Sequence, residues 1–436
     1  MDIQNAQNVQ PRYRQVALAA CFGTFLEWYD FLTFASLATY FGTLFFLAEN
    51  PVTGLLASLA TFGIGMVVRP LGAALFGSLG DRHGRRAVFI ATIALMGVTT
   101  FAVGLLPTYA QVGLWAPLLL LALRILQGLA MGGEIGGATV YLTEHAPAAR
   151  RGLYTSVLQL MGPLGVMAST AQVVLLQSWL APEEFMEWGW RVPFLVSALL
   201  LAISMKSRMA LHESPVFARL RENHGLAKAP LRECLRDRRT LGRMALLFCC
   251  ISAGGSLLFF CSQVYVPVFL KTVVNMEPAR AGHLTLAATL ALFPLTLLAG
   301  GLSDRIGRRP VLLAGLWLGA LAMLPVFWGL RQFAASPALM VILLLVPVVA
   351  LALITGPQTA TLAELFPART RYSAVALPHN LAAGWIGGLS PFMVTLIGSR
   401  SGDPMLGLAY PTVLLLLAAL VGLRFLPETR NSPLTT

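Results

Sequence analysis

The sequence predicts an all-α membrane protein in which twelve transmembrane helices form two pseudo-symmetric six-helix bundles. Three observations predict this fold class: an apolar composition, a series of long apolar segments and an internal repeat. Of the 436 residues, 57% are hydrophobic and 11% are charged, and the mean hydropathy is +0.73. Soluble globular domains are far more polar. The chain therefore belongs in a lipid bilayer.

The apolar segments are long enough to cross a membrane as helices. A hydrocarbon core of about 30 Å requires about 20 helical residues. Membrane helices tolerate the frequent Gly and Pro because neighbouring helices satisfy the freed backbone groups. The twelve segments lie at about 15–44, 54–79, 87–107, 115–140, 154–179, 191–207, 244–270, 281–302, 310–330, 337–360, 374–398 and 408–426. No small-residue cleavage site precedes the first segment, so we expect it to be retained.

The basic residues are distributed unequally between the two sets of loops. With a cytoplasmic N-terminus, 24 of the 31 Lys and Arg residues fall in inner loops and tails, and five fall in outer loops. This positive-inside pattern predicts two cytoplasmic termini. We expect the membrane to be a bacterial-type inner membrane. The net charge of +12 therefore reports topology, and we expect the bilayer rather than nucleic acid as a partner.

The sequence offers no pattern for a metal or a nucleotide. Its five cysteines show no metal-ligand spacing, so we interpret them as small apolar packing residues. No glycine-rich loop precedes any of the three lysines, so a Walker-type phosphate cradle is absent from the sequence. We expect no metal, no cofactor and no enzymatic activity.

Two internal repeats divide the chain into halves. "GSLGDRHGRR" (77–86) recurs as "GGLSDRIGRR" (300–309), and "EHAPAARR" (144–151) recurs as "ELFPARTR" (364–371). The long basic stretch 208–243 separates the halves, so we expect an N-terminal bundle at 1–207, a cytoplasmic interdomain loop at 208–243 and a C-terminal bundle at 244–436. Two parallel six-helix repeats are expected to enclose a site near the membrane midplane.

The repeated loop motif, "RILQG" (124–128) and "PETR" (427–430) resemble the major facilitator superfamily over nearly the whole chain. "EWYDF", "RPLGA", "MGGEIGGA", "WGWRVPF", "ESPVF" and "ELFPARTRYS" are similar to motifs of its metabolite:proton symporters. That branch imports α-ketoglutarate, citrate and tricarballylate, shikimate, or proline and betaine. The first span is most similar to its citrate and tricarballylate members. The resemblance implies the superfamily fold and proton-coupled transport by alternating access.

Five ionisable residues lie deep within the predicted spans: Glu27, Asp30, Arg69, Arg124 and Glu134. An ionised side chain near the bilayer centre costs at least about 2.5–3.5 kcal/mol on insertion scales. Three acids and two arginines leave a net charge of −1 if all are ionised. At least one carboxylate is then expected to lack a partner and to titrate.

The spacing of these residues suggests roles for them. Glu27 and Asp30 share one helical face, and either one is expected to carry the coupling proton, with Glu134 as the next candidate. The planar guanidinium of Arg69 suits bidentate capture of a substrate carboxylate, and Arg124 is the second candidate. The alternative for each is a structural ion pair between helices.

Further residues are expected to line the substrate site or to stabilise the bundle. The polar candidates for the lining are Gln127, Tyr29, Gln159, Gln263 and Tyr265. His379 is the only histidine deep in a span, and we expect it to pack through a hydrogen bond rather than to carry a proton.

The repeated loops are expected to serve conformational change. The resemblance implies that Asp81, Arg85 and Arg86 latch the cytoplasmic side in the outward-facing state, and that Asp304, Arg308 and Arg309 do the same from the second half. If these loops only set the orientation of the chain in the membrane, their arginines would be explained but their aspartates would not. Glu144 and Glu364 are expected to tie these loops to their neighbours.

Together these features predict a monomeric proton-coupled importer of small organic anions, with di- or tricarboxylates as the expected substrates. One alternative is a symporter of zwitterions such as proline or betaine. Others are a proton-coupled exporter of amphipathic cations and a transporter-like metabolite receptor.

Overall fold

The computed structural model describes residues 3–46, 51–209, 213–223 and 227–434. In these ranges the chain forms helices and connecting loops, without a strand. Eleven of the described helical segments are long and apolar enough to cross a membrane, and they coincide with the second to twelfth predicted segments. The first predicted segment is occupied by α1 (Ile3–Ser36) and α2 (Ala38–Phe45). The all-α prediction is therefore confirmed.

The chain divides into two compact units, each described by itself below. The first comprises residues 1–145 and 161–231, and the second comprises 146–160 and 232–436. The segment 146–160 thus packs with the second unit. The bundle and loop boundaries expected from the sequence stay a prediction.

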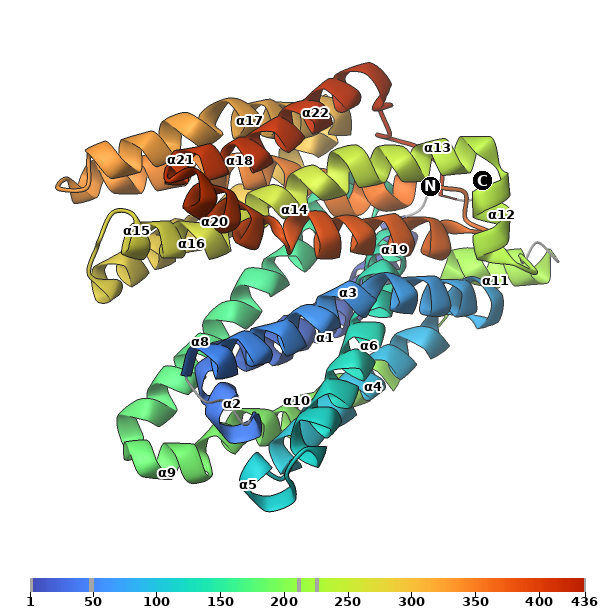
Figure 1. Cartoon of the computed structure of the whole chain (residues 1–436). Helices are drawn as coiled ribbons and strands as arrows, with labels where there is room; N and C mark the ends of the chain where they lie inside the picture. Colours follow the sequence, from blue (N-terminus) through green and yellow to red (C-terminus); the bar gives the residue numbers. More distant parts are fainter. Residues whose placement is uncertain (1–2, 47–50, 210–212, 224–226, 435–436) are drawn as a thin grey trace. The chain divides into compact units, whose positions relative to one another are not determined.

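The first unit is a bundle of long helices with short connecting ones. Its α3 packs mainly against α6, α4 packs against α6 and α10, and α1 packs against α8 (Figure 1). After α1 and α2, its helices are α3 (Pro51–His83), α4 (Arg85–Leu105), α5 (Tyr109–Val112), α6 (Trp115–His145), α8 (Met161–Trp179), α9 (Pro182–Glu187), η3 (Gly189–Arg191), α10 (Val192–Met209) and α11 (Pro215–Glu222); α12 (Pro230–Arg236) lies at the unit boundary.

Glycines allow α3 and α6 to touch through their backbones. A Cβ atom at Gly128 would lie 2.3 Å from the carbonyl oxygen of Gly65, and one at Gly132 would lie 2.0 Å from that of Arg69. Small residues at such crossings let membrane helices approach closely. This approach places Arg69 against α6, about two turns from Arg124.

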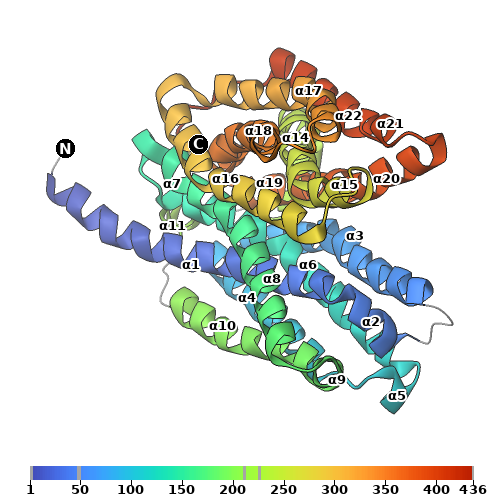
Figure 2. The same ribbon diagram turned by 90° about the vertical axis from the view of Figure 1, so that its left-hand side faces the viewer.

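The second unit contains the remaining helices. Figure 2 shows α17 beside α18 and α22, and α18 also packs against α16 and α7. The helices are η1 (Ala148–Arg150), α7 (Arg151–Ser156), η2 (Val157–Leu160), α13 (Arg238–Leu246), η4 (Leu247–Ser252), α14 (Ala253–Phe259), η5 (Phe260–Tyr265), α15 (Val266–Thr272), α16 (Pro278–Ile306), α17 (Arg308–Gln332), α18 (Pro337–Glu364), α19 (Arg371–Leu381), η6 (Ala382–Gly387), α20 (Ser390–Ser401), α21 (Pro404–Gly407) and α22 (Ala409–Phe425).

Three of these elements, η4, η5 and η6, are π-helical turns within longer spans. Such wide turns leave backbone groups less regularly paired and often lie at functional sites. Because η4 and η6 both pack against α14, the irregular backbone is concentrated in one part of the second unit.

The first span of the second unit begins with a local cap outside the membrane-spanning segment. The Asp237 carboxylate accepts hydrogen bonds from the backbone N–H groups of Arg239 and Thr240. The Thr240 hydroxyl also donates to it, and this hydrogen bond holds the pKa of Asp237 below its ordinary value. An ionised N-cap carboxylate thus fixes where α13 starts.

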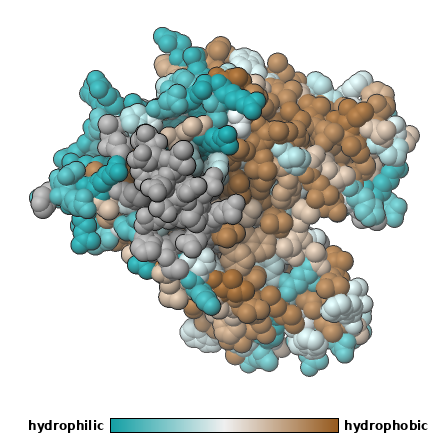
Figure 3. All heavy atoms as spheres, turned by 180° about the vertical axis from the view of Figure 1, so that it is seen from behind, coloured by the Kyte–Doolittle hydropathy of each residue, from teal (hydrophilic) through white to brown (hydrophobic). Residues whose placement is uncertain are grey.

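The exposed side chains are suited to lipid over the middle of the helices. On the face that Figure 3 shows, hydrophobic residues cover much of the central surface, and hydrophilic residues gather toward the helix ends. Leu71 and Leu75 of α3 and Leu298 and Leu321 of the second unit are more than half exposed. Exposed apolar side chains at this density favour contact with acyl chains rather than water.

Candidate transport site

Glu27 and Asp30 lie on one face of α1, inside the first unit. Their exposed fractions are 0% and 1%. Among the described residues, no donor reaches any of the four carboxylate oxygens with regular hydrogen-bond geometry. A buried carboxylate without such bonds is costly when ionised, which makes both groups suited to proton exchange.

Glu27 faces Arg69 of α3. Glu27 Oε1 lies 3.8 Å from Arg69 Nη2, and both side chains are almost fully buried. This distance is within the range of an ion pair but beyond that of a regular hydrogen bond. The two groups are therefore held near each other without being locked together.

Asp30 faces Arg124 of α6 and Thr100 of α4. Arg124 Nη1 donates to Gln127 Oε1 at 2.7 Å, and Gln127 Nε2 donates to the Thr100 hydroxyl at 2.9 Å. The Thr100 hydroxyl, which accepts from Gln127, is thus a neighbour of Asp30. A polar ring thus connects the acid to the guanidinium.

Three phenyl rings surround the Arg124 guanidinium. Its Cζ lies 4.9 Å from the ring centre of Phe31, 4.2 Å from that of Phe34 and 5.5 Å from that of Phe62. These distances fall within the range of cation–π interaction. The rings stabilise a cation in a site from which water is largely excluded.

Glu134 pairs with Arg208, near the end of α10. Arg208 Nη1 donates to Glu134 Oε2 at 2.9 Å, Nη2 is in close contact with Oε1, and Arg208 is fully buried. The Thr92 hydroxyl donates to the same carboxylate at 3.0 Å. The expected net charge of −1 is therefore wrong, because Arg208 turns into the bundle instead of belonging to the loop.

The six groups are here called the charge ladder. It consists of the ion pairs Glu134–Arg208 and Glu27–Arg69 and of Asp30, which faces Arg124 without a direct ion-pair contact. The neighbours of two glycines show in which order these groups follow one another along the helices. A Cβ atom at Gly23, one turn before Glu27, would lie 1.5 Å from Arg208 Nη2. A Cβ atom at Gly65, one turn before Arg69, would lie 3.7 Å from Arg124 Nη2. Successive turns of α1 and α3 therefore meet successive pairs.

The five predicted polar liners do not form one group. Gln127 accepts a hydrogen bond from Arg124. The Tyr29 hydroxyl contacts Gln172 and lies 3.2 Å from the Pro193 carbonyl oxygen. The other three lie in the second unit. Gln159 donates to Thr359, Gln263 accepts from Thr289, and Tyr265 packs against Phe269 and Phe327. Their role in substrate contact stays a prediction.

His379 is buried in α19. Its Nδ1 lies 2.9 Å from the Ser252 hydroxyl of η4. This arrangement agrees with a hydrogen-bonded packing role. It also joins two helices of the second unit next to the π-helical turns.

At the loop between α3 and α4, the predicted residues contact an unforeseen acid. Arg85 pairs with Glu144, and the backbone N–H groups of Arg85 and Arg86 donate to Glu213 Oε1 at 3.2 and 3.3 Å. Gly84 precedes them with a φ of 119°, a conformation that favours glycine. Asp81 is buried at the end of α3. Glu213 thus caps the N-terminus of α4, where a negative charge is stabilising.

The second unit repeats this arrangement. Arg308 pairs with Glu364 at 3.4 Å, and the N–H groups of Arg308 and Arg309 donate to Glu428 at 2.8 and 3.1 Å. The preceding Gly307 has a φ of 108°. Glu428 of the "PETR" motif is therefore the counterpart of Glu213 in "ESPVF".

Asp304 has a second set of donors. Its two carboxylate oxygens accept from the backbone N–H groups of Gly152 and Leu153, each at 2.8 Å, and it also pairs with Arg308 at 2.6 Å. Arg151 reaches Glu364 at 3.0 Å. These bonds hold the start of α7 against the end of α16. The latch role of these residues stays a prediction.

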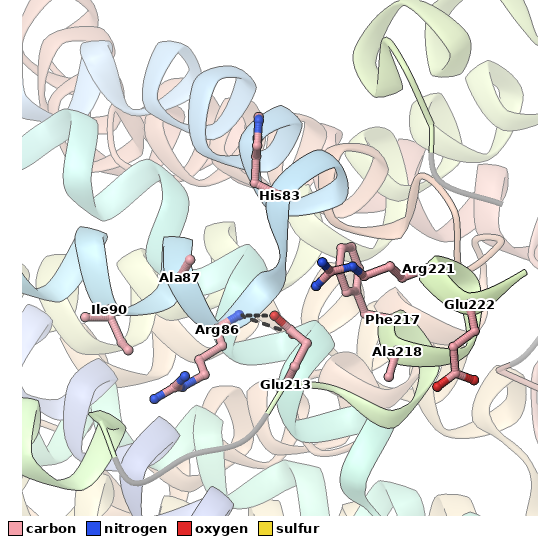
Figure 4. A pocket seen from close by; sticks show the side chains of 9 residues that line it. All are labelled: His83, Arg86, Ala87, Ile90, Glu213, Phe217, Ala218, Arg221 and Glu222. Carbon is pink, nitrogen blue, oxygen red and sulfur yellow. Dashed lines mark hydrogen bonds between the residues drawn. The ribbon is translucent and has the colours of Figure 1, made fainter. Parts of the chain in front are cut away.

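A cavity of about 880 Å³ opens at the end of α3 and the start of α4. Figure 4 shows Arg86 and Glu213 at its centre, with His83 of α3 and Arg221 and Phe217 of α11 around them. Its lining includes Arg86 of the predicted latch but no member of the charge ladder. Within the described residues, no cluster of three or more His, Cys, Asp or Glu side chains is arranged to hold a metal ion.

Sequence reasoning missed several residues of the site. Arg208 was counted with the loop because it is the first residue of the basic stretch 208–243. Thr100 and Phe62 look like ordinary span residues, and only the contact of Thr100 with Gln127 and that of Phe62 with Arg124 mark them. For Glu213 and Glu428 a signal existed, since each follows the last span of its half within a short acidic motif.

Comparison with known proteins places the chain among membrane transporters. A family model described as "Sugar (and other) transporter" matches residues 16–246 and 232–436. The inner membrane metabolite transport protein YhjE of Escherichia coli K12 is 35% identical, over 96% of this chain and 95% of that protein. The proline/betaine transporter of Salmonella typhimurium is 32% identical, over 97% and 85% of the two chains.

Solved structures support the fold. The proton:xylose symporter XylE of the major facilitator superfamily, bound to 6-bromo-6-deoxy-D-glucose, matches with a TM-score of 0.77 at 19% identity, over 98% of both chains. The prediction of twelve helices in the two-bundle superfamily fold is therefore confirmed, and the chain is a multi-pass membrane transporter rather than an enzyme. The chain belongs to the sugar (and other) transporter family of the major facilitator superfamily.

Proposed function

We propose that the protein is a proton-coupled importer of a small zwitterionic metabolite, of the charge type of proline or glycine betaine, in a bacterial-type inner membrane with both termini in the cytoplasm. The observation that carries the proposal is that every acid in the charge ladder faces an arginine. The expectation of di- or tricarboxylates depended on the two intramembrane arginines, Arg69 and Arg124, each of which faces an acid.

A zwitterion is complementary to the pair Asp30–Arg124. Its carboxylate can take the guanidinium and its ammonium group can take the acid, so each buried charge keeps an opposite partner. A dicarboxylate supplies partners for arginines only and would leave a buried carboxylate unpaired, which costs several kcal/mol. The phenyl rings around Arg124 add a surface for a quaternary or secondary ammonium group.

The proton is assigned to Glu27. Protonation of Glu27 removes the negative charge that faces Arg69, and the positive charge of Arg69 then attracts the carboxylate of the substrate. Release of the proton restores the ion pair and lowers the affinity again. Proton and substrate would thus bind together, which is the thermodynamic requirement for symport.

The relatives' names support the same substrate class. The proline/betaine transporter of Salmonella typhimurium covers most of this chain, and so does a glycine betaine/proline/ectoine/pipecolic acid transporter of Dickeya dadantii at 32% identity. Organic acids remain the second candidate, because the Arg124 guanidinium lies beside Gly65, one turn of α3 before Arg69, and the two arginines could together hold two carboxylates.

Uptake into proteoliposomes tests the proposal. With an inward proton gradient, we expect accumulation of radiolabelled glycine betaine or proline and an inward positive current. Citrate and α-ketoglutarate should give neither. Arg124→Gln should abolish uptake, whereas Arg400→Gln, at an exposed position of the second unit, should leave it unchanged. Accumulation of the organic acids without the zwitterions would reinstate the second candidate.

A further inference from the structure

Arg208 contacts more than its partner Glu134. Its Nη1 also donates to the carbonyl oxygen of Phe89, and its Cζ lies 3.6 Å from the ring centre of that residue. The side chain is thereby fixed on three sides: by Glu134 of α6, by Phe89 of α4 and by the bare backbone of α1 at Gly23. A guanidinium held so rigidly acts as a fixed charge.

The fixed pair lies beside Glu27. Gly23 and Glu27 are four residues apart on α1 and therefore on one face. Glu27 therefore interacts electrostatically with both Arg208 and Glu134. The charged groups that face Glu27 are Arg69 from α3, Glu134 from α6 and Arg208 from α10; α8 contributes no ionisable side chain.

We infer that Arg208 is a positioning residue for proton exchange at Glu27: by pairing with Glu134 it cancels that acid's negative charge, and it leaves Glu27 as the acid that exchanges its proton. The inference rests on the proton role proposed above for Glu27. Glu134 then holds a cation in place and does not carry the coupling proton, which differs from the role expected for it from the sequence.

The two partners should have opposite effects on Glu27. Without Arg208, the charge of Glu134 opposes ionisation of Glu27, so Glu27 should stay protonated to higher pH. Without Glu134, the unpaired Arg208 favours ionisation, so Glu27 should lose its proton at lower pH. Removing both charges should nearly cancel these effects. A purely structural tie would not produce shifts of opposite sign.

Infrared spectroscopy of the purified full-length protein tests this without a substrate. The absorption of protonated, buried carboxyl groups is followed against pH, and the component lost in Glu27→Gln is assigned to Glu27. We expect the midpoint of this component to rise by about one pH unit in Arg208→Gln and to fall by a similar amount in Glu134→Gln, since a charge within about 4–6 Å shifts a carboxyl group by 1–3 units. The double variant should return close to the wild type.

Three further variants complete the test. Arg208→Lys keeps the charge and should leave the midpoint near that of the wild type. Lys206→Gln removes an exposed charge from the same helix and serves as the matched control. Gly23→Ala should displace Arg208 and move the midpoint upward. If Arg208→Gln does not fold, Glu134→Gln and Gly23→Ala still predict opposite shifts.

Two results would overturn the inference. In the first, the Glu27 midpoints of Arg208→Gln and Glu134→Gln stay within about 0.3 pH unit of the wild type or shift in the same direction. The pair Glu134–Arg208 would then only connect helices and would have no effect on proton exchange. Absence of any Glu27 component would also overturn it, and would remove the proposed proton role of Glu27 as well. Proton-coupled uptake by the wild type in proteoliposomes separates these two failures from a failure of the transport proposal.

Discussion

The two units carry the same arrangement at one set of helix ends and different chemistry in their interiors. At α4 and α17, each unit places an Arg–Glu pair beside a distant glutamate that caps the helix. Inside, the first unit holds the charge ladder, whereas the sequence has no Asp, Glu, Lys or Arg within 244–270, 284–302, 310–330, 337–360, 374–398 or 408–423. The duplicated helix ends suit a role in conformational change that both halves share. The different interiors suggest that the first unit couples transport to protons, whereas the second contacts the substrate through uncharged groups.

Glu27→Gln tests this separation with the largest expected effect. Because glutamine cannot exchange a proton, uphill uptake driven by a pH gradient should fall to the level of protein-free liposomes. Exchange of labelled for unlabelled glycine betaine at equal pH should continue, because it needs no net proton movement. In the second unit, His379→Gln should retain most of the driven uptake. The opposite pattern, with coupling lost only in His379→Gln, would move proton exchange to the second unit.

Arg124→Ala sharpens the comparison at the level of substrate affinity. Loss of a buried charged partner should weaken glycine betaine binding by about 2–5 kcal/mol. In the second unit, Gln263→Ala removes a neutral hydrogen-bonding group and should cost only about 1 kcal/mol. Equilibrium binding to the purified variants measures both, and Arg124→Lys should lie between Arg124→Ala and the wild type. Equal losses in the two units would contradict the assignment of charge recognition to the first.

The helices and their order could be predicted from the sequence, because span length and hydrophobicity are local properties. The repeats at 77–86 and 300–309 also pointed to the helix ends that contain Arg85 and Arg308. The charge balance could not be predicted, since it depends on whether Arg208 turns outward to the loop or inward to Glu134. That choice is made by Gly23 on a helix 185 positions earlier, whose missing side chain leaves the space.

The grouping of polar residues was likewise beyond the sequence. Gln127 and Gln263 look equivalent as isolated amides in apolar spans. In the structure, Gln127 forms hydrogen bonds with Arg124 and Thr100. Gln263 forms them with Thr289 and Ser262. Such partners come from the packing of distant helices, which no short motif encodes.

Asp304→Asn probes the shared mechanical role. Its carboxylate accepts from two backbone N–H groups and from Arg308, and asparagine keeps only part of this acceptor capacity. We expect the maximal transport rate to change by roughly tenfold, about 1.4 kcal/mol in activation free energy, with the substrate profile and affinity unchanged. Asp81→Asn in the first unit should have an effect of similar size. Initial uptake rates over a range of substrate concentrations measure this, and an altered substrate preference would argue against a latch.

Glu213→Gln and Glu428→Gln give the smallest expected effects and test how far the repetition extends. Each change removes the negative charge that caps a helix N-terminus, which costs roughly 1 kcal/mol. Glu213 is partly buried and Glu428 is exposed, so solvent screening should make the loss larger for Glu213. Thermal unfolding of the purified variants compares them, with Glu222→Gln, an exposed residue of α11, as the control. If neither variant differs from Glu222→Gln, the capping glutamates contribute no stability, and the resemblance between the two helix ends is one of geometry alone.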